Sequence, residues 1–129
     1  MILAFEPINR YEMDYIHTID QAIDFVAQVD SPAMGILADT YHMNIEEASM
    51  EDAFKRAGKL LSHIHLVDNN RLAPGFGHMD FPSLLGALQE AGYEGYLSLE
   101  VLPLPSPEEA ASLGMAYVKG VLENLPQGG

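Results

Sequence analysis

The sequence predicts an α/β protein made of four βα units, with parallel strands inside and helices outside. Short apolar stretches alternate with longer segments whose apolar residues recur at helical spacing. Strict alternation of strands and helices is typical of a parallel sheet. An acid or a histidine follows or closes each apolar stretch, and these groups recur roughly once per βα unit of about 30 residues. They are Glu6, Asp39, His65 and Glu100.

The first two units each begin with an apolar stretch and continue into a helix. Ile2–Phe5 is expected to form the first strand, and the helical pattern of apolar residues predicts a helix over Asp14–Val29. The second strand is expected at Gly35–Ala38. Residues 40–44 are expected to be a loop, and a second helix is expected over 49–61, with Ser49 as a candidate N-cap.

The third and fourth units follow the same order. The third strand is expected at Ser62–Val67 and is followed by a long polar loop over residues 68–79. A third helix is expected over 80–92, because Asp80 can cap its start and Gly92 can end it. Tyr96–Leu99 is the fourth strand, and a last helix is expected over 106–125, where Ser106 and Glu109 form a capping box.

The composition excludes several partners. The 129 residues include six basic and nineteen acidic residues, which gives a formal net charge of −13. Phosphate backbones and anionic membranes attract Lys and Arg, so we expect neither nucleic acid nor a membrane as a partner. There is no cysteine, no apolar run near the ~20 residues of a membrane helix, and no signal-peptide pattern at the start. A cytoplasmic protein is therefore expected.

The four strand-end groups predict a metal site. Carboxyl ends of parallel barrel strands meet on the face of the barrel that carries the chemistry, so Glu6, Asp39, His65 and Glu100 are expected to converge. Three carboxylates and one imidazole suit Mn²⁺, Mg²⁺ or Co²⁺ better than a metal that prefers thiolates. Taken singly, such an acid is usually a helix cap or a solvated loop residue, and such a histidine is usually a core residue.

Polar residues in the adjoining loops have two interpretations each. His42 and Arg71 either bind the oxygens of a substrate or serve locally, His42 as a cap and Arg71 as the partner of a surface acid. Glu12 has the same two interpretations. Asp68 is expected to be an ordinary loop residue. The Gly75–Gly77 stretch either offers amides to a phosphate or makes a tight turn.

Four segments together share the pattern of one enzyme family. These are Glu6-Pro7-Ile8-Asn9-Arg10-Tyr11-Glu12, Asp39-Thr40-Tyr41-His42-Met43-Asn44-Ile45-Glu46-Glu47, His63-Ile64-His65-Leu66-Val67-Asp68-Asn69-Asn70-Arg71 and Pro74-Gly75-x-Gly77-x-x-Asp80-Phe81. They resemble the ketose 3-epimerases, which are the D-tagatose/D-psicose 3-epimerase-like members of the xylose-isomerase-like TIM barrel superfamily. The second segment is the most specific of the four. Hydroxypyruvate isomerases and inosose dehydratases share the spread of ligands.

The resemblance implies an isomerase of carbohydrate metabolism that acts on a small-molecule sugar. It implies metal-assisted proton transfer at C3 of a ketose through an enediolate. By resemblance, the metal is held by Glu6, Asp39, His65 and Glu100. Glu6 and Glu100 are also implied to be the acid/base pair. The residues implied to contact the sugar are Glu12, His42 and Arg71.

The length of the chain sets the expected architecture. A complete TIM barrel has eight βα units and about 250 residues, whereas this chain has four units and resembles the C-terminal half. Residues 1–129 are therefore expected to form one half-barrel domain. The edges at Met1–Glu6 and Tyr96–Glu100 would be unpaired, so we expect a homo-oligomer or a missing N-terminal half.

There are three alternatives to the epimerase. An enzyme like the hydroxypyruvate isomerases or inosose dehydratases stays open, because these families share the spread of ligands. A non-catalytic, truncated half-barrel that binds metal and oligomerises also stays open, because half of a complete barrel is missing. A DNA-repair endonuclease of the same superfamily does not fit the net charge of −13.

Overall fold

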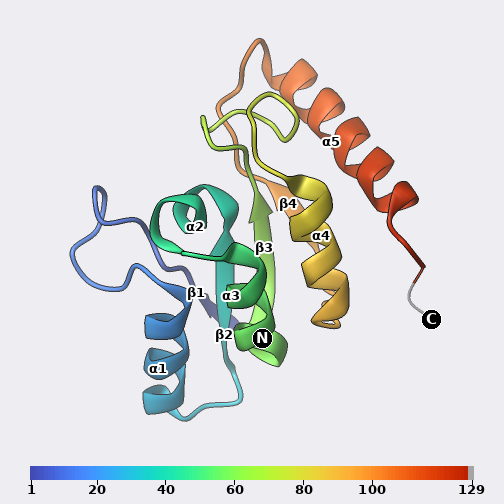
Figure 1. Cartoon of the computed structure of the whole chain (residues 1–129). Coiled ribbons are helices and arrows are strands. Elements are labelled where there is room, and N and C mark those ends of the chain that lie inside the picture. The colour runs from blue at the N-terminus through green and yellow to red at the C-terminus, as the bar shows by residue number, and fades with distance from the viewer. Residues whose placement is uncertain (128–129) are drawn as a thin grey trace.

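The computed structural model describes residues 1–127 of the chain as four parallel strands with helices between them (Figure 1). The strands lie side by side in the order in which they occur in the sequence. This confirms the predicted α/β class with parallel strands. The strand bounds are Leu3–Phe5 for β1, Met34–Asp39 for β2, Leu61–Leu66 for β3 and Leu97–Leu99 for β4.

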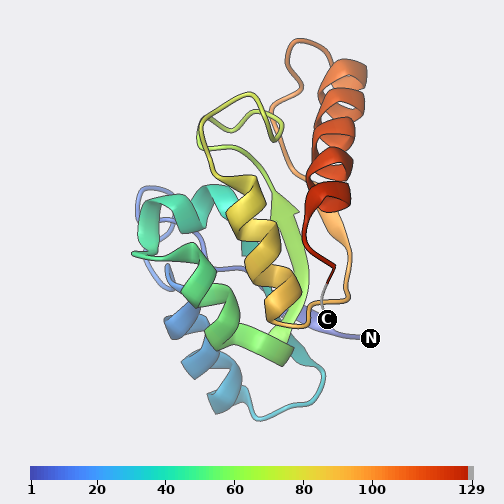
Figure 2. The same ribbon diagram turned by 45° about the vertical axis from the view of Figure 1, so that its right-hand side comes forward.

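The helices form a row along one face of the sheet. In Figures 1 and 2, α1, α3 and α4 lie next to one another over the strands, and α5 follows beside α4. Among residues 1–127, no helix combines the length and the apolar character needed to cross a membrane. The helices are α1 (Ile19–Val29), α2 (Thr40–Glu46), α3 (Met50–Ala57), α4 (Phe81–Glu90) and α5 (Pro107–Asn124), and a short 3-10 turn, η1, spans Gly58–Leu60.

The first helix begins later than the sequence predicts. It starts at Ile19 rather than near Asp14, because Thr18 and Gln21 form a capping box. The Thr18 hydroxyl accepts a hydrogen bond from the Gln21 amide, and the Gln21 side chain accepts one from the Thr18 amide, both at 3.2 Å. Such a reciprocal pair satisfies two free amides at once, which Asp14 alone cannot do. The preceding residues are therefore part of the loop that connects β1 to α1.

A short helix, α2, occupies the segment that was expected to be a loop. Asp39 caps it, and its Oδ1 atom accepts hydrogen bonds from the amides of Tyr41 at 2.8 Å and His42 at 3.4 Å. The helix has seven residues, too few for a recognisable apolar repeat. Its seven residues nevertheless matter for the site, because α2 begins at the carboxyl end of β2.

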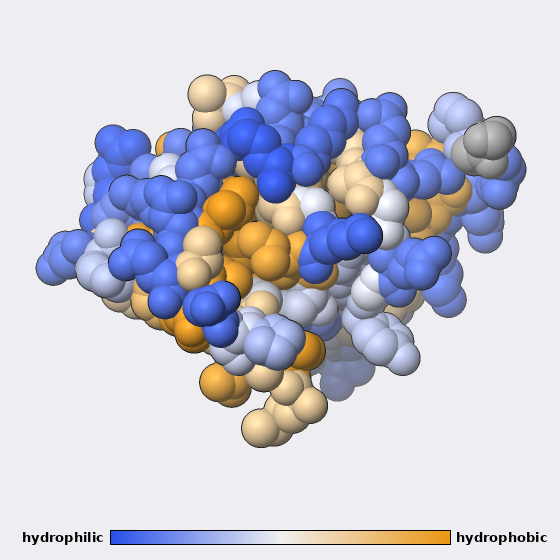
Figure 3. Space-filling model, turned by 90° about the horizontal axis from the view of Figure 1, so that it is seen from below, coloured by the Kyte–Doolittle hydropathy of each residue, from blue (hydrophilic) through white to orange (hydrophobic). Residues whose placement is uncertain are grey.

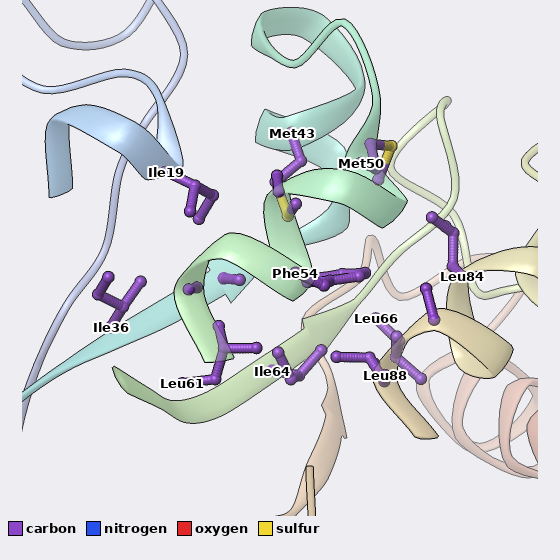
Figure 4. Packing of buried hydrophobic residues seen from close by; sticks show 14 of the residues in the cluster. Ile19, Ile36, Met43, Met50, Phe54, Leu61, Ile64, Leu66, Leu84 and Leu88 are labelled. Atoms are coloured by element: carbon purple, nitrogen blue, oxygen red, sulfur yellow. The ribbon is translucent and has the colours of Figure 1, made fainter. Parts of the chain in front are cut away.

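The core lies between the helices and the outer face of the sheet. Phe54 of α3 is fully buried within it, and Ile64 and Leu66 of β3 are also fully buried. Figure 4 shows these side chains together with Leu84 and Leu88 from α4. Burying side chains of this size supplies most of the stabilisation of a domain, at about 25 cal/mol per Å².

The other face of the sheet has a different character. Neighbouring strands place Leu37 beside His63, and His65 beside Ser98. These side chains are only partly buried, apart from Asp39 at the end of β2. Figure 3 shows the molecule from below, at the end where β3 begins, and there apolar residues gather in the middle of the surface with polar residues above and beside them.

A side chain extends the pairing of β2 and β3 beyond the ends of the strands. The Thr40 hydroxyl donates a hydrogen bond to the Val67 carbonyl at 2.6 Å and accepts one from the Val67 amide at 2.9 Å. Both residues are fully buried. The hydroxyl therefore satisfies both backbone groups of Val67 where no strand backbone is available to do so.

Candidate metal centre

Four side chains come together at the carboxyl ends of the strands. Glu6 follows β1, Asp39 ends β2, His65 is the next-to-last residue of β3 and Glu100 follows β4. One oxygen or nitrogen atom from each lies within 4.8 Å of the others. The structure thus gathers in one place the four groups that the sequence singled out.

The imidazole of His65 lies at the centre of the cluster. Its Nδ1 atom is 2.7 Å from Oε2 of Glu100, 3.6 Å from Oδ2 of Asp39 and 4.0 Å from Oε1 of Glu6. The Nδ1 atom and Oδ2 of Asp39 are both buried and have no hydrogen-bond partner among the described residues. Buried polar atoms without partners are rare and call for an explanation, of which an ion is one.

The donor set fits a hard or borderline divalent cation. Three carboxylates and one imidazole offer oxygen and nitrogen, and there is no thiolate in the chain. Mn²⁺, Mg²⁺ and Co²⁺ accept such ligands. The unpartnered, buried Asp39 oxygen is the kind of atom that a cation would satisfy.

Asp39 uses its two oxygens for different purposes. Oδ1 caps α2 through the amides of Tyr41 and His42, and this holds the carboxylate in one orientation. Oδ2 then points into the cluster, where Arg71 Nη1 is 3.5 Å away. The cap therefore sets the direction of a candidate ligand.

Burial raises the pKa of two carboxylates of the cluster, Glu6 and Asp39. Burial raises the pKa of Glu6 to about 6, and the nearby charges of Asp39 and Glu100 add to this, while His65 and Arg71 oppose it. Burial also raises the pKa of Asp39, although His42 and Arg71 act against it. Crowded acids with raised pKa values are typical of sites that hold a cation or move a proton.

His42 lies beside the cluster in a buried position. Its Nδ1 atom accepts a hydrogen bond from the Asn9 amide at 3.3 Å and is 2.8 Å from the Asn9 side-chain nitrogen. Burial lowers the pKa of His42, against the influence of Asp39. A neutral imidazole that accepts at Nδ1 carries its proton at Nε2, and this atom is 4.0 Å from Glu6. The local capping role considered for His42 is not what the structure shows.

Glu12 lies at the rim of the same region. Its carboxylate accepts a hydrogen bond from the Asn9 side chain and is 3.9 Å from His42 Nδ1. About half of the Glu12 side chain is exposed. Asn9 thus joins Glu12 to His42, and it is a fully buried residue that the sequence did not single out.

Arg71 turns toward the cluster rather than toward a surface acid. Its guanidinium carbon is 4.5 Å from the centre of the Tyr41 ring, and Nη1 is 3.5 Å from Asp39 Oδ2. Its backbone has a φ of +69°. Tyr41 was likewise not singled out from the sequence.

Asp68 proves to be a structural centre and not an ordinary loop residue. It is buried and accepts hydrogen bonds from four backbone amides. The amides are those of Asn69, Gly75, Gly77 and Met79, at 2.9 to 3.1 Å. The amides of Gly75 and Gly77 are therefore engaged by a carboxylate within the chain, which overturns the phosphate interpretation of this stretch.

His63 lies one layer below His65 on the inner face. Its Nε2 atom is 2.6 Å from the Ser98 hydroxyl, and its ring meets that of His65 edge-on, with centroids 5.2 Å apart. Burial lowers the pKa of His63. The ring thus supports the imidazole at the centre of the cluster from beneath.

Comparison with known proteins places this arrangement in context. Residues 1–121 match the family described as xylose isomerase-like TIM barrel. The chain is 42% identical over 100 residues to a D-psicose 3-epimerase of Enterocloster bolteae and 37% identical over 99 residues to a 3-dehydro-D-guloside 4-epimerase of Escherichia coli. The structure superposes with a TM-score of 0.88, at 29% identity and over 95% of the chain, on a D-psicose 3-epimerase crystallised in the presence of D-fructose.

The matched proteins are much longer than this chain. The matches cover 78% and 77% of the chain but only 33% and 38% of the two curated relatives, and 50% of the crystallised protein. The chain therefore spans about a third to a half of the proteins that it resembles. The resemblance inferred from the four sequence segments and the half-barrel fold class are both confirmed.

Proposed function

Because the chain belongs to the xylose isomerase-like TIM barrel family, we propose that it is the metal-binding half of a sugar epimerase. Residues 1–129 would form the C-terminal half of the barrel. The proposed reaction is proton transfer at C3 of a ketose through an enediolate. The relatives named as sugar epimerases support the reaction class.

One observation carries the proposal. Ligand atoms of Glu6, Asp39, His65 and Glu100 lie within 4.8 Å of one another. Two of these atoms, on Asp39 and His65, are buried without a hydrogen-bond partner in the described part of the chain. A purely structural cluster would satisfy such atoms internally, because an unpaired buried polar group costs about 1–3 kcal/mol.

The four residues would hold one divalent cation, either Mn²⁺, Mg²⁺ or Co²⁺. When bound, such an ion supplies Lewis-acid polarisation of a carbonyl oxygen. Asp39 is suited to be a fixed ligand, because its cap on α2 leaves only one oxygen free for the cluster.

Glu6 and Glu100 are the proposed acid/base pair. They follow the first and the fourth strand, so they flank the cluster from the two outer strands with Asp39 and His65 between them. One carboxylate would remove the proton at C3, and the other would return a proton to the opposite face of the sugar. Burial brings the pKa of Glu6 to about 6, which is close enough to neutrality for a general base.

Glu12, His42 and Arg71 are the proposed sugar contacts. His42 offers an Nε2 proton to a hydroxyl or carbonyl oxygen, because its Nδ1 atom is already occupied by Asn9. Beside the cluster, Arg71 has a buried Nη1 atom that no group within residues 1–127 hydrogen-bonds. Glu12 is exposed enough to meet a ligand that approaches from solvent.

Solvent deuterium exchange tests the proposal. The chain would be incubated with D-fructose and Mn²⁺ in D₂O, and deuterium is expected at C3 of the ketose. Glu100→Gln should abolish the exchange, whereas Glu123→Gln, an exposed acid on α5, should not affect it. Label at C1 alone would indicate an aldose–ketose isomerase. No label at any carbon would favour the non-catalytic half-barrel.

A further inference from the structure

We propose that Tyr41 is a positioning residue that, with the loop gathered around Asp68, holds the Arg71 guanidinium in one place beside the metal cluster. The Arg71 guanidinium would then be in position to hydrogen-bond an oxygen of the sugar before the sugar binds. This proposal deepens the proposed function, and it rests on that function for the nature of the oxygen.

The backbone of Arg71 is held in an unusual conformation. Its φ of +69° is one of two positive values at non-glycine residues in the described part of the chain. A bulky side chain adopts this conformation only where the surroundings impose it. The Arg71 amide donates to the Asp68 carbonyl at 3.0 Å, and the Arg71 carbonyl accepts from the Leu102 amide at 2.8 Å. Because both its amide and its carbonyl are hydrogen-bonded, the backbone of Arg71 is fixed, and so is the direction in which its side chain starts.

The loop that carries Arg71 is organised by a single carboxylate. Oδ1 of Asp68 accepts from the amides of Asn69 and Met79, and Oδ2 accepts from those of Gly75 and Gly77. Residues far apart along the loop are therefore tied to one point. A Cβ atom on Gly77 would collide with the side-chain oxygens of Asp68 and Asn69, so the close approach requires glycine there.

The guanidinium is fixed by an aromatic face and a neighbouring acid. The Tyr41 ring lies 4.5 Å from the guanidinium carbon, within the range of a cation–π contact. On the cluster side, Nη1 faces Asp39 Oδ2 at 3.5 Å, too far for a good hydrogen bond. Nη1 is buried and without a partner among the described residues. The planar group is thus oriented while one of its donors stays available.

The position of Tyr41 depends on the cluster itself. Its amide donates to Oδ1 of Asp39 at 2.8 Å, in the first turn of α2. Asp39 therefore has two roles. Its Oδ2 atom is the proposed metal ligand, and its Oδ1 atom fixes the backbone of Tyr41, whose ring contacts the Arg71 guanidinium. The ligand and the guanidinium are placed relative to each other by one short helix.

Nuclear magnetic resonance of the ¹⁵N- and ¹³C-labelled full chain tests the proposal without metal or sugar. Side-chain protons of Arg71 that lie over a tyrosine ring should resonate upfield of those of an unstacked arginine. Tyr41→Leu should remove the upfield shift, and Tyr41→Phe, which keeps the ring, should restore it. Tyr15→Leu is the matched control, because Tyr15 is exposed and lies in the loop before α1.

Asp68 is tested in the same way. Asp68→Asn should also remove the upfield shift of Arg71, whereas Asp24→Asn, an exposed acid on α1, should leave it in place. If Asp68→Asn does not fold, Gly77→Ala perturbs the same loop through its contact with Asp68 and should reduce the shift.

Two results would overturn the proposal. One is an unshifted Arg71 in the unsubstituted chain, and the other is a shift that persists in Tyr41→Leu. Neither depends on turnover or metal binding. A stacked Arg71 in a chain that shows no deuterium exchange would reject the proposed function and leave the placement intact.

Discussion

The Nδ1 atom of His65 lies 2.7 Å from Oε2 of Glu100, yet the two atoms make no hydrogen bond. The distance suits a hydrogen bond, but the alignment does not. Two atoms that bind the same ion also lie close together without a hydrogen bond between them, so this relationship is compatible with the proposed metal site.

Asp39→Asn should weaken Mn²⁺ binding by at least about 100-fold, since even partners outside the ligand shell typically contribute 10–100-fold. The substitution removes a negative ligand oxygen but keeps a good N-cap for α2. Calorimetric titration should show one ion per chain before substitution. Asp24→Asn, which changes the net charge equally on an exposed surface of α1, should bind Mn²⁺ as tightly as the unsubstituted chain. Equal Mn²⁺ affinities for the two variants would show that Asp39 is not a ligand.

Mn²⁺ binding should weaken as the pH falls below about 6. The pKa of Glu6 is raised to about 6, and that of Asp39 is raised as well, so protons compete with the ion at and below this pH. One displaced proton lowers the affinity about tenfold for each pH unit below the pKa. Titrations from pH 5 to pH 8 measure this directly. A flat affinity between pH 5 and pH 7 would contradict the raised pKa of Glu6.

Without metal, the contribution of Glu6 to the free energy of unfolding should depend on pH in the opposite direction, increasing as the pH falls. The folded-state pKa of Glu6, about 6, lies above its ordinary value of 4.5, so protonation favours the folded state. This contribution is fully present below pH 4.5 and is lost as the pH rises through about 6. Urea unfolding of the unsubstituted chain and of Glu6→Gln, without metal, should differ in pH dependence within this window.

Phe54→Ala should destabilise the fold by about 3–5 kcal/mol. The ring is completely buried between α3, the sheet and α4, so truncation leaves a cavity. Phe76→Ala is the matched control, because the Phe76 side chain is 42% exposed in the long loop, and its loss should cost under about 0.5 kcal/mol. Urea denaturation measures both values. Similar denaturation midpoints for the two variants would show that the Phe54 ring is not buried in the core.

The chain should associate in solution. β1 and β4 each pair on one side only, and Ile2 and Tyr96 near these edges are 53% and 84% exposed. Unpaired edges and apolar surface favour pairing with another chain. Light scattering should give a mass above 14.1 kDa, and added salt should strengthen association by screening the net charge of −13. A monomer at micromolar concentration in both low and high salt would refute this.

The strands and the cluster were accessible to sequence reasoning because each rests on a local, repeated signal. An apolar stretch ending in an acid or histidine recurs once per βα unit. Because the strands are parallel, their carboxyl ends meet and these side chains come close together. The start of α1 was misplaced because Asp14 and Thr18 are both acceptable caps, and only the reciprocal partner Gln21 decides between them. α2 was missed because it has two turns and no apolar repeat.

The supporting residues could not be predicted, because their roles depend on contacts between distant segments. Asn9 meets His42 across 33 residues. Asp68 gathers amides from as far as Met79. Nothing in the local sequence distinguishes Asp68 from an exposed loop acid, because the two glycines whose amides bind it, Gly75 and Gly77, follow it only after six other residues.

The hydroxyl of Thr40 extends the hydrogen bonding between β2 and β3 by one residue beyond the ends of the strands. Because it serves both backbone groups of Val67, the long loop begins from a fixed residue and not from a fraying strand end. Transient opening of the loop should therefore stop at Val67, whose amide would exchange with solvent at the slow rate of β3. Only a side chain that both donates and accepts can do this, so serine can replace Thr40, but the equally sized valine leaves two backbone groups buried and unpaired.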